Sequence, residues 1–290
     1  MTTTKGDEFL EQAEKKLKGW GLLSNKYEDA LELYSKAINI YKMNKAWDKA
    51  ADVLQRTVAC HNKCDSKYDA ATALNEAGQM LKKMPDNIEA SVRVMSESVE
   101  IFLELGKLNQ AAKIEKEIGE ALEEVENYAD AIVHLQRAAD LYESENQKTT
   151  ANICLLKVAH MNASLENYEP AIELFEKSIE YAVDDRMLKF QAKEYIFKAA
   201  ACRLAQITDK DQLEDFKTKY EEYKDMDVHF PDSFEAKLID GVVEAWDKGD
   251  LRLFQQHMRD YDRIKKLDPW KMNLFLKIKS GVENVGNDLT

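Results

Sequence analysis

Three residues with metal-binding side chains lie within about one helical turn of one another: Cys60, His61 and Cys64. A structural zinc site needs a fourth ligand, and no other ligand with a recognisable spacing follows elsewhere in the sequence. The alternative is that they are small buried residues on the packing face of a helix, where free cysteines are common. The sequence therefore predicts free thiols and no metal site.

Sequence motifs for catalysis are absent. The pair Gly19 and Gly21 is not followed by the third glycine of a dinucleotide-binding loop. There is also no phosphate-binding loop, no paired-histidine zinc motif and no nucleophile elbow. We therefore predict that the protein is not an enzyme and needs no cofactor.

Lysines recur at a long, regular spacing in the middle of the chain. Lys113, Lys157 and Lys193 are separated by 44 and 36 residues. If helical hairpins of about this length stack, the three lysines lie along one face. Four further lysines are expected near that face: Lys82, Lys83, Lys107 and Lys189. Such a stripe could bind an acidic partner, or it could be ordinary solvated helix surface, with some lysines serving helix C-termini.

An apolar cluster interrupts the N-terminal region. Trp20, Leu22 and Leu23 lie in a stretch, residues 19–25, that begins with two closely spaced glycines. These side chains could fold back on the first hairpin. They could equally touch a membrane, where their burial would contribute roughly 5 kcal/mol before ordering costs. Each nearby lysine would add about 1 kcal/mol on an anionic surface. Both interpretations remain open from the residues alone.

The elements that position these residues are repeated helices. A similar phrase occupies residues 26–38, 127–139 and 167–179. In each copy an aromatic residue is followed by a small one and then by aliphatic ones at helical spacing. The small residue, Ala30, Ala131 or Ala171, marks where a neighbouring helix comes close. Weaker copies begin near residues 47, 68, 88 and 108, which gives a helix period of about 20 residues and a pair period of about 40. Such periods are typical of stacked hairpins.

The predicted fold is therefore all-α. We expect a tetratricopeptide-like solenoid of helical hairpins, a twisted sheet of antiparallel helices, over residues 1–206, with the apolar loop at 19–25. A C-terminal helical bundle at 207–280 closes the array, as a solenoid end requires. Within it, Ser233 should begin one helix, and Asp268 with Pro269 should begin the last. Residues 281–290 are expected to form a flexible tail.

Composition limits the possible partners. The chain has 290 residues, with 41 basic and 54 acidic side chains and a net charge of −13, which argues against nucleic acid. Only 10 glycines and 4 prolines leave little material for turns. No segment has 18 consecutive apolar residues, and the first residues lack the apolar core of a signal peptide. We therefore expect a cytoplasmic protein.

Several segments resemble one known family. They are residues 151–159 (ANICLLKVA), 188–200 (LKFQAKEYIFKAA), 42–47 (KMNKAW) and the C-terminal stretch from 267–270 (LDPW) to Leu289. Together they resemble the soluble NSF attachment proteins of the alpha/beta type, and the resemblance covers essentially the whole chain.

The resemblance implies an adaptor that lies on assembled SNARE four-helix bundles of the syntaxin type, several copies per bundle. The adaptor recruits the hexameric ATPase NSF, which takes the bundle apart during vesicle trafficking and membrane fusion. The implied SNARE-contact positions are Lys82, Lys83, Lys107, Lys113, Lys157, Lys189, Phe190 and Lys193. The implied membrane contacts are Trp20, Leu22 and Leu23, in a peripherally associated protein, and the implied ATPase contacts are Glu244, Asp247 and Leu289.

Two positions depart from the family pattern. Ile153 stands where relatives commonly carry a lysine, and Phe234 where they commonly carry an arginine. SNARE affinity is then lower, or its main contribution shifts to Lys157 and Lys193. The alternative function is a generic scaffold of the tetratricopeptide type that binds a peptide or a helical partner in its groove.

Overall fold

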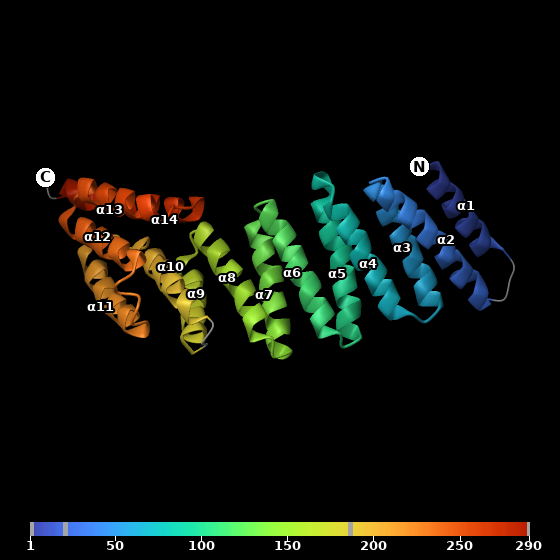
Figure 1. The fold of residues 1–290 in the computed structure, drawn as a ribbon, viewed down its shortest axis with the longest axis horizontal. Coiled ribbons are helices and arrows are strands. Elements are labelled where there is room, and N and C mark those ends of the chain that lie inside the picture. The colour runs from blue at the N-terminus through green and yellow to red at the C-terminus, as the bar shows by residue number, and fades with distance from the viewer. Residues whose placement is uncertain (1–2, 20–22, 185–187, 289–290) are drawn as a thin grey trace. The chain divides into compact units, whose positions relative to one another are not determined.

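A computed structural model describes residues 3–19, 23–184 and 188–288 (Figure 1). Within these ranges the secondary structure is helical, without strands, which confirms the all-α prediction. The chain forms two compact units, Met1–Cys154 and Leu155–Thr290, and each is described by itself. The helices of the first unit are α1 (Thr4–Lys18), α2 (Leu23–Met43), α3 (Trp47–Lys63), α4 (Lys67–Lys82), α5 (Ile88–Glu104), α6 (Leu108–Glu124) and α7 (Tyr128–Ser144).

Helix α8 (Lys148–Ser164) contains the boundary between the two units. The helices of the second unit are α9 (Tyr168–Asp184), α10 (Ala192–Leu204), α11 (Lys210–Met226), α12 (Phe234–Lys248), α13 (Leu251–Ile264) and α14 (Pro269–Asp288). The repeated phrases of the sequence form α2, α7 and α9. Their small residues Ala30, Ala131 and Ala171 are fully buried, as expected for sites of close helix approach.

Short turns with a common geometry join most of the repeated helices. Each contains one residue with positive φ, and these residues recur about every 20 positions. They are Lys45, Asp65, Gly106, Glu126, Asn146 and Glu166. A left-handed residue after the last helical turn is a common way to end a helix. The turn between α4 and α5 is different, because Pro85 begins a short 3₁₀ helix there, Pro85–Asn87.

The first unit has two layers of helices. Its main helix contacts are between consecutive helices, while polar side chains connect every second one. Lys42 of α2 forms an ion pair with Glu76 of α4, and Gln79 of α4 donates a hydrogen bond to Glu117 of α6 at 3.1 Å. The even-numbered helices α2, α4 and α6 therefore lie side by side in one layer.

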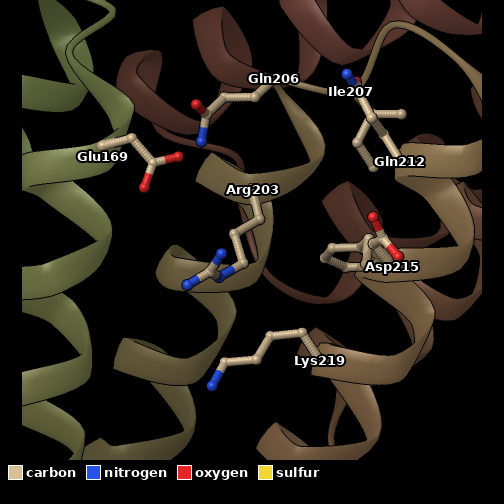
Figure 2. Close-up of a pocket in the computed structure, with 8 residues that line it drawn as sticks. Glu169, Arg203, Gln206, Ile207, Gln212, Asp215 and Lys219 are labelled. Carbon is tan, nitrogen blue, oxygen red and sulfur yellow. The ribbon is translucent and has the colours of Figure 1, made fainter.

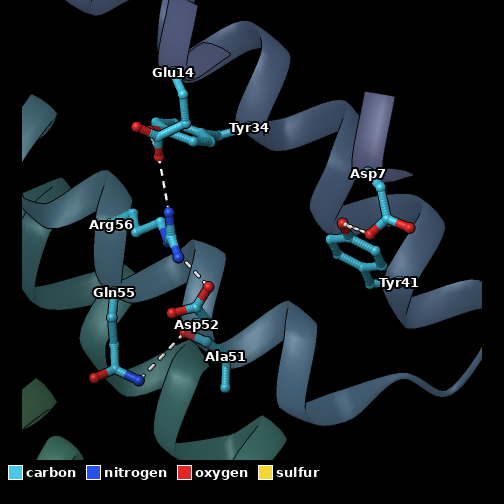
Figure 3. A network of polar contacts seen from close by, with 8 residues as sticks. All are labelled: Asp7, Glu14, Tyr34, Tyr41, Ala51, Asp52, Gln55 and Arg56. Atoms are coloured by element: carbon cyan, nitrogen blue, oxygen red, sulfur yellow. Dashed lines mark hydrogen bonds and ion pairs between the residues drawn. The ribbon is translucent and has the colours of Figure 1, made fainter. Parts of the chain in front are cut away.

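The odd-numbered helices form the other layer. Arg56 of α3 lies 3.0 Å from Glu14 of α1, and Arg137 of α7 lies 2.8 Å from Glu100 of α5. The hydroxyl of Tyr34 also donates to Glu14, at 2.9 Å (Figure 3). Glu14 therefore connects α1 to both α2 and α3.

A second carboxylate holds the N-terminal end of α1. Asp7 accepts hydrogen bonds from the Tyr41 hydroxyl of α2 at 2.7 Å and from Lys49 of α3 at 2.8 Å. Figure 3 shows Asp7 and Tyr41 facing each other across the α1–α2 contact. The hydrogen bonds from Lys49 and Tyr41 lower the pKa of Asp7. Helix α1 is thus attached at two points seven residues apart, on one of its faces.

The second unit packs as a bundle. Besides consecutive contacts, α10 touches α12 and α14, and α12 touches α14. Trp246 of α12 is fully buried, and its indole lies against Gly281 of α14. The predicted helix starts are confirmed, because Ser233 accepts from the Ala236 amide at 3.0 Å and Asp268 accepts from the Lys271 amide at 2.8 Å. The predicted domain boundary at residue 206 stays a prediction.

Two sequence expectations differ from the structure. The predicted flexible tail from residue 281 is helical, because α14 continues to Asp288 and buries Val282 and Val285. Gly281 does not stop the helix. A Cβ there would lie 2.8 Å from Trp246 Nε1, so glycine permits a close approach instead. At the predicted 19–25 loop, α2 already begins at Leu23.

Candidate partner-binding surfaces

The four predicted lysines of the first unit are distributed over both ends of α5. Lys82 ends α4 and Lys83 follows it, while Lys107 immediately precedes α6 and Lys113 lies in the second turn of α6. Because α5 runs 17 residues between these turns, Lys83 and Lys107 are about 25 Å apart along its axis, while Lys113 lies partway back along α6. A surface that includes all four lysines would span the length of a helix.

Two of these lysines have partners within the first unit. The Lys83 ammonium lies 4.0 Å from the centroid of the Trp47 ring, a cation–π contact. Lys113 is largely exposed and lies 3.9 Å from Glu117. Such exposed pairs are weak, so Lys113 remains accessible to a partner's carboxylate.

In the second unit three predicted residues come together. Lys189 and Phe190 lie in the 3₁₀ helix Lys189–Gln191, which leads directly into α10, and Lys193 is in the first turn of α10. The Phe190 side chain is 79% exposed, which is unusual for a large aromatic residue. The structure therefore supplies a compact surface with two cations and one exposed ring.

Lys157, the remaining predicted lysine, is half-buried on α8, one turn before a residue that the sequence did not single out. That residue, His160, lies against Trp270 with ring centroids 4.6 Å apart, and the Trp270 indole donates to the His160 carbonyl at 3.2 Å. Burial, with help from the Lys198 charge, lowers the pKa of His160 to about 3. His160 is therefore neutral and helps to hold α14 against α8.

The two predicted ATPase-contact acids lie on the exposed face of α12. Glu244 pairs with Lys248 at 2.6 Å, and Asp247 lies 3.6 Å from Lys217 of α11. Both carboxylates are solvent-accessible. The third predicted contact, Leu289, lies outside the described residues.

The predicted membrane contacts fall largely outside the described part of the chain. Trp20 and Leu22 are not among the described residues, and only the backbone of Leu23, the first residue of α2, is described. No helix in the described ranges is long and apolar enough to cross a membrane.

The two departures from the family pattern are both at the surface. Ile153 on α8 is 46% exposed and Phe234 at the start of α12 is 43% exposed. The Lys237 ammonium lies 5.6 Å from the Phe234 ring centroid. Each position thus presents an apolar side chain to solvent, where a cation could also have been accommodated.

None of the four cysteines forms a disulfide. Cys60, Cys154 and Cys202 are buried and Cys64 is half-buried, all as free thiols. Burial raises the pKa of Cys60 and of Cys64, so neither thiol is activated. Within the described ranges no three His, Cys, Asp or Glu side chains are arranged to hold a metal ion.

A polar pocket of about 400 Å³ lies between α9, α10 and α11 (Figure 2). Arg203 and Lys219 line it, with Glu169 at its edge. Arg203 donates to Glu176 at 2.9 Å and to the Tyr223 hydroxyl at 2.7 Å. The positive charge of Arg203 is therefore already balanced by Glu176. The contacts of Arg203 connect the three helices around the pocket.

A groove of about 430 Å³ lies in the first unit between α2 and α4, with α3 as its floor. Leu31, Asn39 and Glu76 are among its walls, and Leu54 and His61 belong to its floor. Burial lowers the pKa of His61, which is therefore neutral near pH 7. The groove offers mixed apolar and polar surface, of the kind that accommodates an extended or helical segment.

Sequence comparisons extend over nearly the full length of the chain. It is 34% identical over 279 residues to an alpha-soluble NSF attachment protein of Vitis vinifera, covering 96% of this chain and 94% of that one. It is also 34% identical to the Mus musculus alpha protein, with 97% and 96% covered. The identity to a beta-soluble NSF attachment protein of Bos taurus is 33%, with 96% and 94% covered.

Structural comparison supports the fold. A signal transduction ATPase from Pyrococcus horikoshii with a tetratricopeptide repeat sensor matches with a TM-score of 0.53 and 16% identity. The match covers 95% of this chain but only 44% of that protein, so it concerns the helical repeat alone. The family model described as "Soluble NSF attachment protein, SNAP" matches residues 4–283. The chain therefore belongs to the soluble NSF attachment protein family.

Proposed function

We propose that this protein is an adaptor that binds assembled SNARE complexes and recruits and stimulates the ATPase NSF for their disassembly. The observation that carries the proposal is family membership over residues 4–283, together with relatives named as NSF attachment proteins. Relatives in Schizosaccharomyces pombe and Neurospora crassa are named probable vesicular-fusion proteins. The role would belong to vesicle-mediated transport, including traffic between endoplasmic reticulum and Golgi.

The proposed SNARE contact in the second unit is the surface formed by Lys189, Phe190 and Lys193, with Lys157 contributing from α8. Ion pairs with acidic side chains of the bundle would be individually weak and screened by salt. The exposed Phe190 ring would add an apolar contact that salt does not screen. In the first unit, the proposed contacts are Lys82, Lys83, Lys107 and Lys113.

The proposed contact with NSF comprises Glu244 and Asp247 of α12 and Leu289. The two carboxylates are exposed and each forms an ion pair with a lysine, and such exposed pairs are weak enough for a cationic partner surface to displace the lysine at little cost. Trp20, Leu22 and Leu23 would touch the membrane surface and hold the adaptor peripherally. Several copies would bind one SNARE complex.

A disassembly assay tests the adaptor role. A fluorophore-labelled SNARE bundle is mixed with NSF and ATP, with and without this protein, beside a Leu289→Ala variant. We expect wild type to support disassembly and the variant to bind the bundle without supporting it. If wild type gives no disassembly while another adaptor does with the same NSF, the proposed function is wrong.

A second function, a scaffold that binds a peptide or helix, is favoured by one observation, the groove between α2 and α4. A scaffold would bind a short linear peptide tightly and would be indifferent to loss of Leu289. Substituting Leu31→Lys in the groove wall would then abolish binding, whereas the adaptor model expects normal SNARE disassembly from this variant.

A further inference from the structure

Helix α13 carries a straight row of arginines on its outer face. Arg252, Arg259 and Arg263 are all exposed and are spaced by seven and four residues. At 100° per residue these spacings place the three side chains within about 40° of one another, over a length of about 16 Å. Gln255 and Gln256 occupy the same face between the first two arginines, and both are exposed. We call this surface the α13 arginine row.

The opposite face of α13 holds it in the bundle. Phe254 and Tyr261 are buried, and the Phe197 and Tyr261 rings stack with centroids 6.0 Å apart. The N-cap Asp250 accepts from the amides of Arg252 and Leu253. The arginine row therefore sits on a helix that is held in the bundle, so the backbone positions of the three arginines are fixed.

The arginine row has no ion-pair partner among residues 3–19, 23–184 and 188–288. Among the described residues, no carboxylate forms an ion pair with the side chains of Arg252, Arg259 or Arg263. By contrast, Arg56 and Arg137 each bind two carboxylates. In a chain of net charge −13, the row places three guanidinium groups side by side with no carboxylate paired to them in the described residues. Guanidinium groups favour planar, two-point hydrogen bonding to carboxylates, so the row presents unused binding capacity.

The flanks of the row also constrain its ligand. Asp260 and Asp262 lie about 80° away from the row on either side, so an acidic ligand avoids them only if it is narrow. Ile264, the exposed apolar side chain of this helix, lies about 120° from Arg252, well off the row. Within α13, no exposed large hydrophobic residue therefore lies on the face of the row, and the strongly acidic protein as a whole repels a broad anionic surface.

We propose that the α13 arginine row is a docking surface for an α-helix of a protein partner that carries a matching row of carboxylates. A rod about 10 Å wide fits between the flanking aspartates, and acidic residues at the same helical spacing would face the three arginines. An anionic membrane fits less well, because it is broad and because the row has no apolar side chain to insert. None of the three arginines is among the lysines and acids of the proposed adaptor contacts.

The test uses the full-length protein and a fluorescent helical peptide of about 20 residues with glutamates at positions i, i+7 and i+11. Binding is measured by anisotropy at about 0.15 M salt, where distant charges are screened. We expect binding that weakens about tenfold or more in an Arg252→Ala, Arg259→Ala, Arg263→Ala variant. The same peptide with glutamines should not bind.

A matched control removes three other exposed cations. Lys45→Ala, Lys63→Ala and Lys210→Ala give the same net charge, and these lysines are exposed. This control should bind the peptide as wild type does. A charge swap adds specificity: Arg259→Glu should lose binding, and a peptide with lysine at the facing position should restore it. Circular dichroism checks that each variant is folded.

Three outcomes would overturn the proposal. Wild type could fail to bind the glutamate peptide at this salt concentration. The two triple variants could lose binding equally, which would indicate only a general charge effect. Finally, vesicles containing about one-third anionic lipid could bind wild type more tightly than the peptide does, in a way that depends on the three arginines, and the surface would then be a membrane contact.

Discussion

Glu115 is the most deeply buried carboxylate of the first unit and connects α6 to α7. It is 1% exposed, and its two oxygens lie 2.6 Å from His134 Nδ1 and 2.9 Å from Arg137 Nη1. A buried carboxylate is tolerated only when it is paired and hydrogen-bonded. Removing a partner of Glu115 would leave a buried charge unpaired and should therefore lower the free energy of unfolding.

We therefore expect Arg137→Ala to destabilise the protein by about 2 kcal/mol, less than for a fully buried pair because Arg137 is partly exposed. The measurement is urea unfolding followed by circular dichroism. Arg56→Ala is the matched control, because its partners Asp52 and Glu14 are more exposed. It should cost under about 1 kcal/mol. Equal losses for the two variants would contradict this account.

The attachment of α1 should depend on pH. The pKa of Asp7 lies below its ordinary value of 3.8 because Lys49 and Tyr41 donate to it. For Glu14, burial raises the pKa, but the hydrogen bonds from Arg56 and Tyr34 outweigh it and the pKa lies below 4.5. A lowered folded-state pKa contributes stability that is present above the ordinary value and is lost as the pH falls through the folded value.

We therefore expect α1 to loosen as the pH falls below the ordinary carboxyl values of 4.5 and 3.8 and through the lower folded-state values, while it stays attached at neutral pH. Limited proteolysis within α1 across this range measures the effect. In an Asp7→Asn, Glu14→Gln variant, cleavage should already be faster at neutral pH and should change little on acidification. A variant that keeps the full pH dependence would assign it to other carboxylates.

Residue-level features were predictable from the sequence only where they are local. Ser233 and Asp268 cap helices through amides three residues away, so the sequence indicated both. The pair Trp270 and His160 is 110 residues apart, and no spacing rule connects such positions. The alignment of the predicted lysines on one face stays a prediction, and their role remains a proposal.

At the scale of elements, the short turns between the repeated helices contain a backbone conformation that costs free energy. The sequence did not indicate this conformation. Lys45, Asp65, Glu126 and Glu166 have positive φ although none is glycine or asparagine. Side chains with a Cβ adopt this region at a cost of about 1 kcal/mol or more. Gly106 occupies the equivalent position with φ of +65°, and a Cβ there would touch nothing within 4 Å.

Opposite substitutions should therefore have opposite effects. We expect Gly106→Ala to destabilise by about 1 kcal/mol purely through backbone strain, and Glu126→Gly to stabilise by a few tenths up to about 1 kcal/mol. Thermal unfolding of both variants provides the measurement. If Gly106→Ala is neutral, the turn relaxes without strain and the argument fails.

The C-terminal helix shows why one element boundary was missed. Glycine after an apolar run usually indicates a helix end, and Gly281 led to the prediction of a tail. In the structure the next turns bury Val282 and Val285, and tertiary packing overrides the local signal. The repeat itself was predictable because its 20-residue period is visible in the sequence without any knowledge of packing.

At the scale of the molecule, the two units differ in how contacts are distributed. The main helix contacts of the first unit are between consecutive helices, whereas the second has additional contacts among α10, α12 and α14. Stability in the first unit is then nearly a sum over neighbouring helices, with the terminal one held least. In the second unit it is shared among several helices at once.

Native-state hydrogen exchange should reveal this difference. We expect amides of α1 to open with the lowest free energy, those of α4 to α6 with more, and those around Trp246 only with unfolding of the whole second unit. Exchange of α1 amides solely through global unfolding would contradict the neighbour-by-neighbour description.

The cross-connections on the two layers of the first unit also have a mechanical consequence. The ion pair of Lys42 with Glu76 lies in the even-numbered helix layer, and that of Arg56 with Glu14 lies in the odd-numbered layer. Bending the unit would stretch the contacts within one layer and compress those within the other. Because both layers contain ion pairs that salt screens, we expect the first unit to become more compliant as salt increases.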